Sequence, residues 1–365
     1  MAPPAHTPAR IVGAPWWEYR YSLYTKHISP SCVFMLESLP PLLVIAVAIV
    51  AGFAGLIWSA DRFVAGSAAI ASSFGVAPVV IGLTIVAFGT SAPEIMVSIS
   101  ASLKGAGDMA VGNGIGSNIA NTGLVLGATA LVVAIPVQKH LLKDELPLLL
   151  VVMAVSGYFL SDGILAQWEA IVLIGALIPA IFLLVYLKKG DLSEQETTDE
   201  DSIPHLSRTM AFVWFVIGLG ALMLSSEVLV WGAKSAAEMA GVSPLVIGLT
   251  IIALGTSLPE LAASLISALK GHHDIALGNV LGSNMFNLLA VMSIPGLSGS
   301  FPLDQSVFNR DFVVMLALTL LLAVAIGLSI WRNRGASGGK IGKTAGCLLL
   351  LSYFGYYVLL YQTAI

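Results

Sequence analysis

Long apolar runs, separated by short polar stretches, follow one another from about residue 41 to the end of the chain. Each run is near the roughly 20 apolar residues that a helix needs to cross a bilayer. We therefore predict ten membrane-spanning helices; the fourth is the shortest, and its ends are the least sharply marked. The predicted spans are 41–59, 76–103, 109–134, 147–160, 168–187, 209–231, 242–269, 275–296, 312–330 and 344–362.

The composition agrees with this pattern and excludes a soluble protein. Hydrophobic residues make up 57% of the 365 residues and charged residues only 10%, with a mean hydropathy of +0.90. A soluble domain carries roughly 25% charged residues. No basic patch with interleaved aromatic residues points to a nucleic acid. Cys32 and Cys347 lie far apart, and we expect both to be free thiols.

The chain contains an internal repeat. Residues 82–121 recur as residues 248–287 with a constant offset of 166 and no gap, and 53 aligned positions around them hold 28 identities. Upstream the likeness weakens but persists, since Asp61 aligns with Glu227. Five spans per half is an odd number, so the second half must insert upside down. The predicted fold class is an all-α polytopic membrane protein with ten transmembrane helices in two inverted five-helix repeats, a plan common among secondary transporters.

The repeat divides the chain into four parts. The first forty residues lack a signal-peptide core and precede an apolar run that begins shortly after Met35, so Met35 is a candidate for the true start. The parts are an N-terminal extension, most of which a start at Met35 would make non-native (1–40), the first five-helix repeat (41–187), an acidic linker (188–208) and the second five-helix repeat (209–365).

The distribution of Lys and Arg predicts the orientation in the membrane, because cytoplasmic loops carry an excess of both. The loops predicted inside hold Arg62, Lys139, Lys143, Lys188, Lys189, Arg208, Lys270, Arg332, Arg334, Lys340 and Lys343. Those predicted outside hold Lys104, Lys234 and Arg310. We therefore expect a multi-pass protein of the cell membrane with both termini outside and loop 188–208 in the cytoplasm. That loop lacks the spaced ligands of an EF-hand, so we interpret it as a linker rather than a calcium sensor.

A proline breaks the second span and its copy in the seventh. The ring of Pro93 clashes with the carbonyl of Gly89, four residues earlier, and Pro259 does the same to Gly255. Neighbouring helices, water or a cation must then satisfy the freed carbonyl groups. Hydroxyl groups cluster at both breaks, on Thr90, Ser91, Thr256 and Ser257.

A glutamate follows each proline: Glu94 in the first repeat and Glu260 in the second. A carboxylate near the bilayer centre costs on the order of 3 kcal/mol even on lenient insertion scales. Two carboxylates at matching positions of inverted repeats should face each other, where they repel unless a cation lies between them. A divalent ion cancels their charge, and calcium accepts six to eight oxygen ligands. A structural polar pair within the bundle is the alternative.

The following span of each repeat carries a polar face. Asn113, Ser117 and Asn121 are four residues apart and share one helix face, and Asn279, Ser283 and Asn287 repeat the pattern. Neutral oxygens beside a carboxylate pair suit a monovalent ion such as sodium. Asn118 and Asn284 lie off this face and are weaker candidates, suited to interhelical hydrogen bonds.

The segments GTSAPE…GNGIGSNIAN and GTSLPE…GNVLGSNMFN resemble the two alpha-repeats of the calcium/cation antiporter superfamily, most nearly its bacterial calcium/sodium antiporter group. The resemblance covers about residue 41 to the C-terminus. It implies that the broken helices cross at mid-membrane and that sodium entry drives calcium extrusion by alternating access. It also implies the metal ligands: carboxylates of Glu94 and Glu260, carbonyls of Thr90 and Thr256, sodium-site hydroxyls of Ser91, Ser257, Ser117 and Ser283, and Asn121 and Asn287 at the centre.

One position departs from part of that superfamily. Some members, including potassium-dependent exchangers, carry Asp where this chain has Asn287, so potassium dependence is not expected here. Calcium and sodium ions and the lipid bilayer are the expected partners, with no prosthetic group and no obligate protein partner. A calcium/proton antiporter is the main alternative, since paired buried glutamates can carry protons. An intramembrane hydrolase and an ion channel are weaker alternatives, and we do not expect an enzyme.

Overall fold

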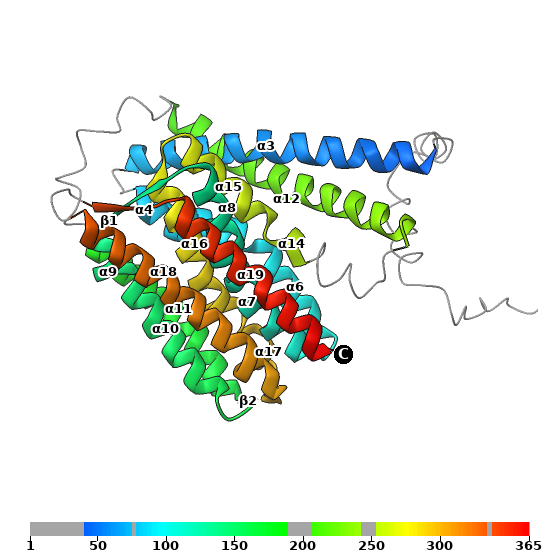
Figure 1. Ribbon diagram of the computed structural model, residues 1–365, viewed down its shortest axis with the longest axis vertical. Helices are drawn as coiled ribbons and strands as arrows, with labels where there is room; N and C mark the ends of the chain where they lie inside the picture. Colours follow the sequence, from blue (N-terminus) through cyan, green and yellow to red (C-terminus); the bar gives the residue numbers. More distant parts are fainter. Residues whose placement is uncertain (1–39, 75–77, 189–205, 242–252, 334–337, 365) are drawn as a thin grey trace, which may run out of the picture.

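The structure is a computed structural model that describes residues 40–74, 78–188, 206–241, 253–333 and 338–364 (Figure 1). The predicted N-terminal extension, including Met35 and Cys32, and nearly all of the acidic linker lie outside these residues. Cys347 is an exposed free thiol, as expected.

The described part of the first repeat is helical over nearly all of its predicted spans. Its second span is broken into short pieces, and its third span contains a π-helical segment. The elements are α3 (Pro41–Phe74); α4 (Pro78–Ile81), η1 (Gly82–Val86), α5 (Ala87–Thr90) and α6 (Ala92–Leu103); α7 (Gly107–Ala120), η2 (Asn121–Val125) and α8 (Leu126–Val132); α9 (His140–Lys143) and α10 (Glu145–Leu160); and α11 (Gln167–Lys188).

The second repeat follows the same order. The described part of its broken span begins at residue 253, and the first part of the predicted span 242–269 lies outside the described residues. The elements are α12 (Arg208–Met239); α14 (Ala253–Thr256) and α15 (Leu258–Leu269); α16 (His273–Phe286), η6 (Asn287–Val291) and α17 (Ile294–Leu297); η7 (Val307–Phe312) and α18 (Val313–Arg332); and α19 (Lys343–Ala364).

The first and sixth helices are much longer than predicted. The predicted spans 41–59 and 209–231 are wrong at their C-terminal ends, because α3 has 34 residues and α12 has 32. Arg62 and Lys234 accordingly lie within helices, not in loops. At 1.5 Å per residue each helix is about 50 Å long, which exceeds the bilayer core and requires a strong tilt. A tilted helix accommodates polar residues such as Asp61 part-way along its length, and the prediction took these as the end of the span.

Glycines let α3 and α12 pack backbone against backbone. A Cβ atom on Gly52 would lie 2.7 Å from the Leu229 nitrogen, and one on Gly218 would lie 2.5 Å from the Phe63 nitrogen. Residues 52 and 218 are 166 apart, as are 63 and 229. Exchanging the two repeats therefore converts the first contact into the second. This is the pseudo-two-fold symmetry expected of inverted repeats.

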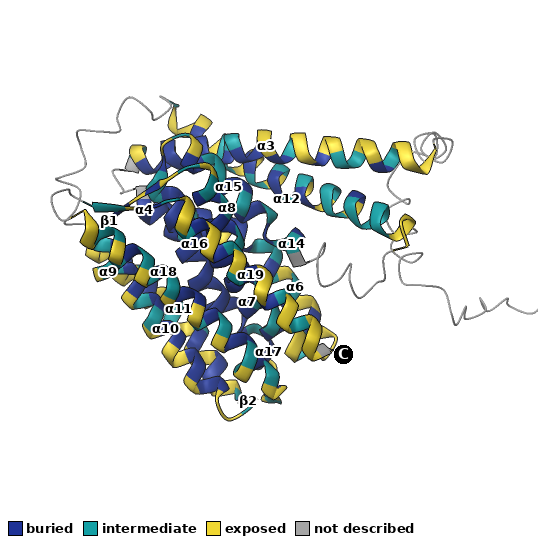
Figure 2. Cartoon of the chain, viewed as in Figure 1, coloured by how far each residue is buried: buried dark blue, intermediate teal, exposed yellow. Residues whose placement is uncertain are grey.

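The other helices form a compact core beside this pair. In Figure 1, α3 and α12 lie together across the top of the view, whereas the core helices run diagonally below them. The span formed by α16, η6 and α17 is completely buried over its most apolar stretch, whereas only 22% of the most apolar stretch of α3 and 17% of that of α12 is buried. Figure 2 shows this difference in burial. A Cβ on Gly278 would lie 2.7 Å from the Val79 carbonyl oxygen, so α16 packs directly on the first broken helix.

Two short antiparallel sheets tie the repeats together. Strand β1 (Ile135–Gln138) pairs with β4 (Gly338–Ile341), and β2 (Ile164–Leu165) pairs with β3 (Phe301–Pro302). The first sheet brings together two loops that sequence analysis placed on the same side through their lysines: Lys139, Lys143, Lys340 and Lys343. Which face of the membrane this end meets stays a prediction.

Candidate cation site

The predicted helix breaks lie at the centre of both repeats. Helix α5 ends at Thr90 and α6 begins at Ala92, with a bend of 44° between the two segments of this span. Ser91 joins them with φ −80° and ψ 4°, and Ser257 has nearly the same conformation, φ −89° and ψ 4°. The two prolines therefore produce the same local geometry in both repeats, and the prediction of a duplicated break is confirmed.

Both glutamates lie in the first turn of a helix that starts at the break. Glu94 belongs to the first turn of α6 and Glu260 to that of α15, and each is only 1% exposed. The N-terminus of a helix carries a partial positive charge, which favours a carboxylate there. This partial charge does not neutralise a full carboxylate, so two ionised glutamates in the interior would need a further positive charge.

The two carboxylates interact across the repeats. Glu260 of the second repeat lies close enough to Glu94 of the first for the charges of the two carboxylates to repel each other. Ser117 donates a long hydrogen bond, 3.5 Å, to Oε1 of Glu94. The side chains that sequence analysis derived from separate repeats thus meet at one centre.

Helices α7 and α16 hold the broken helices through their asparagines. Asn113 donates from Nδ2 to the Glu94 carbonyl oxygen at 3.1 Å, and Asn279 donates to the Glu260 carbonyl oxygen at 3.4 Å. These two bonds are equivalent under the repeat. Thr90 Oγ1 also donates to Oδ1 of Asn279 at 3.0 Å and lies 3.4 Å from Oγ of Ser283. The polar face predicted on each helix therefore does point at the glutamate-bearing helices.

Asn121 and Asn287 differ from the asparagines one and two turns earlier. Both are buried, at 1% and 0% exposure, and neither end of either side-chain amide has a hydrogen-bond partner within the described residues. Each is the first residue of a π-helical segment, η2 or η6. Such segments are often found at functional sites, where they redirect side chains and carbonyl groups.

Unpaired polar atoms concentrate at this centre. A buried polar atom without a partner costs about 1–3 kcal/mol, so native proteins contain few of them. Here the atoms without a hydrogen-bond partner in the described part of the chain include seven oxygens: Oγ of Ser91 and Ser257, Oε2 of Glu94, both carboxylate oxygens of Glu260, and Oδ1 of Asn121 and Asn287. Calcium takes six to eight oxygen ligands, so this donor set fits a calcium ion, with hydroxyl and amide oxygens available to sodium.

The site has two carboxylates and no third. Within the described ranges, no group of three or more His, Cys, Asp or Glu side chains could hold a metal ion. The charge available to a cation is therefore −2, supplied by Glu94 and Glu260. The remaining donors are neutral oxygens.

Three polar groups near the site are structural. Asn118 donates to the Asn284 carbonyl oxygen at 3.1 Å, and Asn284 donates to Thr122 Oγ1 at 3.0 Å, so these asparagines form interhelical hydrogen bonds. Ser226 of α12 donates to the Gly255 carbonyl oxygen at 3.0 Å. A neighbouring helix thus satisfies one of the carbonyl groups freed by proline. No sequence motif marks Ser226, because its counterpart in the first repeat is Ala60, which carries no hydroxyl group.

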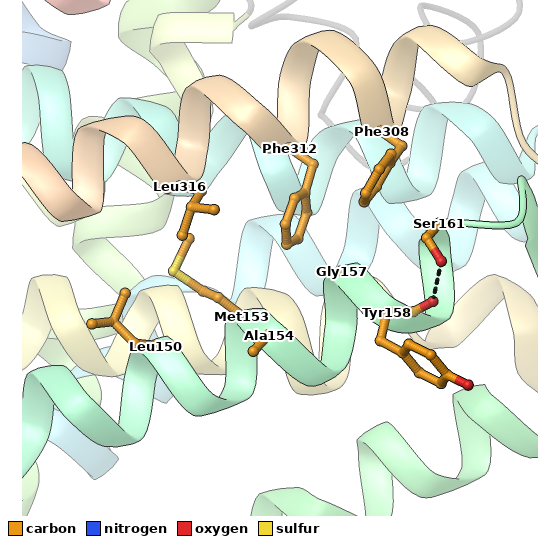
Figure 3. A pocket seen from close by; sticks show the side chains of 9 residues that line it. All are labelled: Leu150, Met153, Ala154, Gly157, Tyr158, Ser161, Phe308, Phe312 and Leu316. Atoms are coloured by element: carbon orange, nitrogen blue, oxygen red, sulfur yellow. Dashed lines mark hydrogen bonds between the residues drawn. The ribbon is translucent and has the colours of Figure 1, made fainter.

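A groove with an apolar lining lies elsewhere in the described part of the molecule. It encloses about 350 Å³ between α10 and α18, and Figure 3 shows its lining of aliphatic and aromatic side chains. The ring of Phe312 packs against Gly157, where a Cβ would lie 2.7 Å from the ring. The Ser161 hydroxyl group donates to the Tyr158 carbonyl oxygen, as Figure 3 shows. This groove offers no carboxylate and is not a cation site.

Comparisons with known proteins identify the family of this chain. The profile of the family described as "Sodium/calcium exchanger protein" matches residues 44–186 and 210–362. The chain is 44% identical to "Putative antiporter CaxA" of Alkalimonas amylolytica, covering 88% of this chain and all of that protein. It is 30% identical to sodium/calcium exchanger MaX1 of Methanosarcina acetivorans, covering 85% of this chain and 96% of the relative.

A solved structure gives the same result for the fold. The sodium-calcium exchanger NCX_Mj superposes with a TM-score of 0.71 at 32% identity, covering 86% of this chain and 97% of that one. That protein has ten transmembrane helices in two inverted repeats, which confirms the predicted fold class. The proteins similar to this chain are transporters, not enzymes. With both halves matched by the family profile and a site assembled from the two repeats, this chain belongs to the sodium/calcium exchanger protein family and is a membrane antiporter of calcium and other cations.

Proposed function

We propose that the protein exchanges sodium for calcium across the cell membrane by alternating access, with Glu94 and Glu260 as the shared carboxylate ligands. The observation that carries the proposal is the set of buried, unpaired oxygens contributed by both repeats around these two glutamates. Thr90, Ser91, Ser117 and Asn121 of the first repeat, and Thr256, Ser257, Ser283 and Asn287 of the second, complete the proposed ligands.

The net charge of the site explains why the two fluxes are coupled. An empty site would expose two carboxylate charges to the membrane interior, which is unfavourable by several kcal/mol. One calcium ion or two sodium ions cancel the charge of −2. Only a loaded site then passes readily from one face to the other, so calcium moves only when another cation returns.

Sodium is the preferred counter-ion because of the neutral donors. Two protons could also cancel the charge of the glutamates, but a proton needs no further ligands. The unpaired Asn121 and Asn287 amides and the Ser91 and Ser257 hydroxyls have an evident use with sodium. Proton coupling is the outcome that the experiment below would reveal if this reasoning fails.

The membrane orientation is also part of the proposal. We propose that the end carrying the β1–β4 sheet faces the cytoplasm, together with loop 188–208, and that both termini face outside. The lysines beside this sheet support that orientation through the positive-inside rule.

Transport in proteoliposomes tests the function. Vesicles loaded with sodium are diluted into sodium-free, potassium-free buffer containing radiocalcium, at equal pH on both sides. We expect calcium uptake that collapses when sodium is present equally on both sides. Uptake that ignores sodium but follows an imposed pH gradient would replace sodium by protons as the counter-ion. No uptake under either gradient would refute calcium exchange.

A further inference from the structure

An ion pair joins one long helix to the core at one end of the molecule. Lys270 Nζ lies 2.7 Å from Oδ1 of Asp61 and 3.5 Å from its carbonyl oxygen. Asp61 belongs to α3 of the first repeat, and Lys270 directly follows α15 of the second. Their side chains are 39% and 32% exposed. The pair is therefore a partly solvated contact between the tilted helix pair and the broken helix of the opposite repeat.

The repeat supplies the same pair of charges a second time. Lys104 occupies the position in the first repeat that Lys270 occupies in the second, and both lie in the sequence Leu-Lys-Gly. The glycines that follow, Gly105 and Gly271, have φ values of +71° and +84°. Both lysines therefore leave the end of a broken helix through the same left-handed turn. Glu227 of α12 occupies the position in the second repeat that Asp61 occupies in the first. The sequence therefore contains a second acid–lysine pair, Glu227 with Lys104.

Only one of the two pairs is formed. Glu227 and Lys104 are both exposed, and neither makes a side-chain ion pair or hydrogen bond within the described ranges. The packing of α3 on α12 is nevertheless symmetric, as the matched glycine contacts demonstrate. The asymmetry thus lies in how the helix pair is attached to the core, and not inside the pair.

The attachments differ in kind as well as in place. On α12, the neighbour of Glu227 is Ser226, which donates to the Gly255 carbonyl oxygen. On α3, the neighbour of Asp61 is Ala60, which cannot make such a bond. Helix α12 is therefore attached to the break of its own repeat, whereas α3 is attached to the far end of the broken helix of the other repeat.

The two ends are distinct parts of the molecule. The turn that follows Lys104 lies beside the β2–β3 sheet, since a Cβ on Gly107 would meet the ring of Phe301 at 2.6 Å. The Asp304 nitrogen also donates to Asp108 there, at 3.1 Å. In a molecule made of inverted repeats, the state open to the opposite side is expected to be the structural image of the first. In that image Glu227 would meet Lys104, and Asp61 would leave Lys270.

We propose that Asp61–Lys270 and Glu227–Lys104 are alternating positioning pairs, each holding the α3–α12 helix pair at one end of the core in one of the two transport states. This inference rests on the proposed alternating access and adds the residues that balance its two states. Because the formed pair is partly exposed, its contribution is modest. A modest bias suits a device that must release in every cycle, since it changes the ratio of the two states only a few-fold.

Crosslinking tests the alternation in the full-length protein. In a background with Cys32→Ser and Cys347→Ser, one variant carries Asp61→Cys with Lys270→Cys and another carries Glu227→Cys with Lys104→Cys. A short bifunctional thiol reagent is added to each in membranes. We expect both pairs to crosslink, and each crosslink to stop calcium exchange until it is cleaved. The matched control, Asp61→Cys with Lys104→Cys, should not crosslink. Failure of the 227–104 pair to crosslink in folded protein would overturn the proposal.

Single charge removals give a second readout that a merely structural role would not move. Lys270→Gln and Lys104→Gln should shift the ratio of the two crosslinkable states in opposite directions, each by about two- to tenfold. Lys270→Gln is assayed by crosslinking the 227–104 cysteine pair, and Lys104→Gln by crosslinking the 61–270 cysteine pair. The double charge reversal Asp61→Lys with Lys270→Asp should restore the original ratio. Shifts in the same direction, or no shift, would contradict alternation. Crosslinking does not depend on which ion is exchanged. Failure of the alternating pairs can therefore be distinguished from failure of the proposed sodium coupling.

Discussion

The central helices α7 and α16 and the outer helices α3 and α12 each come from equivalent positions of the two repeats, yet the two sets differ in burial and in the contacts that hold them. The most apolar stretch of the span that contains α16 is completely buried, whereas only 22% of the most apolar stretch of α3 is buried. The core crossing carries amides and hydroxyls, several of them unpaired. The outer pair is held by glycines packed against backbone, with its ion pair to the core part-way along α3.

This difference separates two tasks. The core holds the oxygens that we propose as ligands in a dense environment that shifts little, because close-packed interiors tolerate small displacements poorly. The outer pair has a largely exposed apolar surface and few directional bonds to the core, so we expect it to be the part that moves against the core. The variants below are expected to affect one region and spare the other, in order of decreasing effect.

The largest effect is expected from the core carboxylates. Glu94→Gln and Glu260→Gln each halve the charge that cancels calcium, and each should abolish detectable sodium-driven radiocalcium uptake while leaving a folded, membrane-inserted protein. The matched control is Glu169→Gln, a buried carboxylate in the first turn of α11 whose Oε2 accepts from the Ala166 nitrogen at 2.8 Å. That variant should retain uptake. Normal exchange by either site variant would remove its glutamate from the assignment.

The amides of the core should separate binding from packing. Asn287→Ala removes an unpaired amide, and we expect calcium half-saturation to rise about ten- to a hundredfold, as for loss of a ligand to a charged group. Asn284→Ala, three residues earlier on the same helix, removes the 3.0 Å bond to Thr122. It should lower the unfolding temperature and change half-saturation by less than about threefold, since neutral hydrogen bonds contribute about 1 kcal/mol. Both are read from calcium titrations and thermal melts; equal effects of the two variants on affinity would contradict the assignment of Asn287.

The outer pair should respond to volume, not to polarity. Gly218→Ala places a methyl group 2.5 Å from the Phe63 nitrogen, and overpacking of this kind costs typically about 1–3 kcal/mol. We expect the exchange rate to fall about tenfold while calcium affinity changes little. Gly220→Ala, two residues on, meets no atom of the described chain within 4 Å. It should leave the rate unchanged and raise helix stability slightly. A larger loss from Gly220→Ala than from Gly218→Ala would argue against the packing described.

The smallest effect is expected where the two regions touch. Ser226→Ala makes α12 match α3, whose equivalent residue is Ala60, and leaves the Gly255 carbonyl group without its donor. A single neutral hydrogen bond contributes about 0.5–1.5 kcal/mol, so we expect a rate change of at most about tenfold and no change in the counter-ion. Ser225→Ala is the neighbouring control. Loss of all uptake in Ser226→Ala would show that this contact is essential and that the outer pair is not loosely attached.

Sequence reasoning predicted the core better than the outer pair, for a physical reason. Proline, glutamate and asparagine at matching positions of two repeats leave few alternatives, because each is unfavourable in an apolar helix without a specific use. The helix breaks at Pro93 and Pro259 and the convergence of the polar faces could therefore be predicted. The lengths of α3 and α12 could not, since Asp61 and Arg62 are typical of a span end, and only the structure shows that the helix continues past them.

Contacts between distant residues were also beyond the sequence. The Asp61–Lys270 pair joins residues 209 positions apart, and nothing local in either segment indicates the other. The Ser226 bond to Gly255 depends on how α12 lies against the break. The two small sheets, β1–β4 and β2–β3, form from loop segments of two to four residues that carry no clear strand pattern.

The central claim is that calcium and sodium compete for one pair of carboxylates, and equilibrium binding tests it most directly. Radiocalcium binding to the purified protein is measured at constant pH and ionic strength while sodium replaces a large organic cation. We predict that sodium raises the apparent calcium dissociation constant steeply, with no change in the number of calcium ions bound at saturation, and that Glu94→Gln and Glu260→Gln abolish this binding. Calcium binding that is indifferent to sodium but falls as protons are added would contradict the account and identify protons as the competing cation.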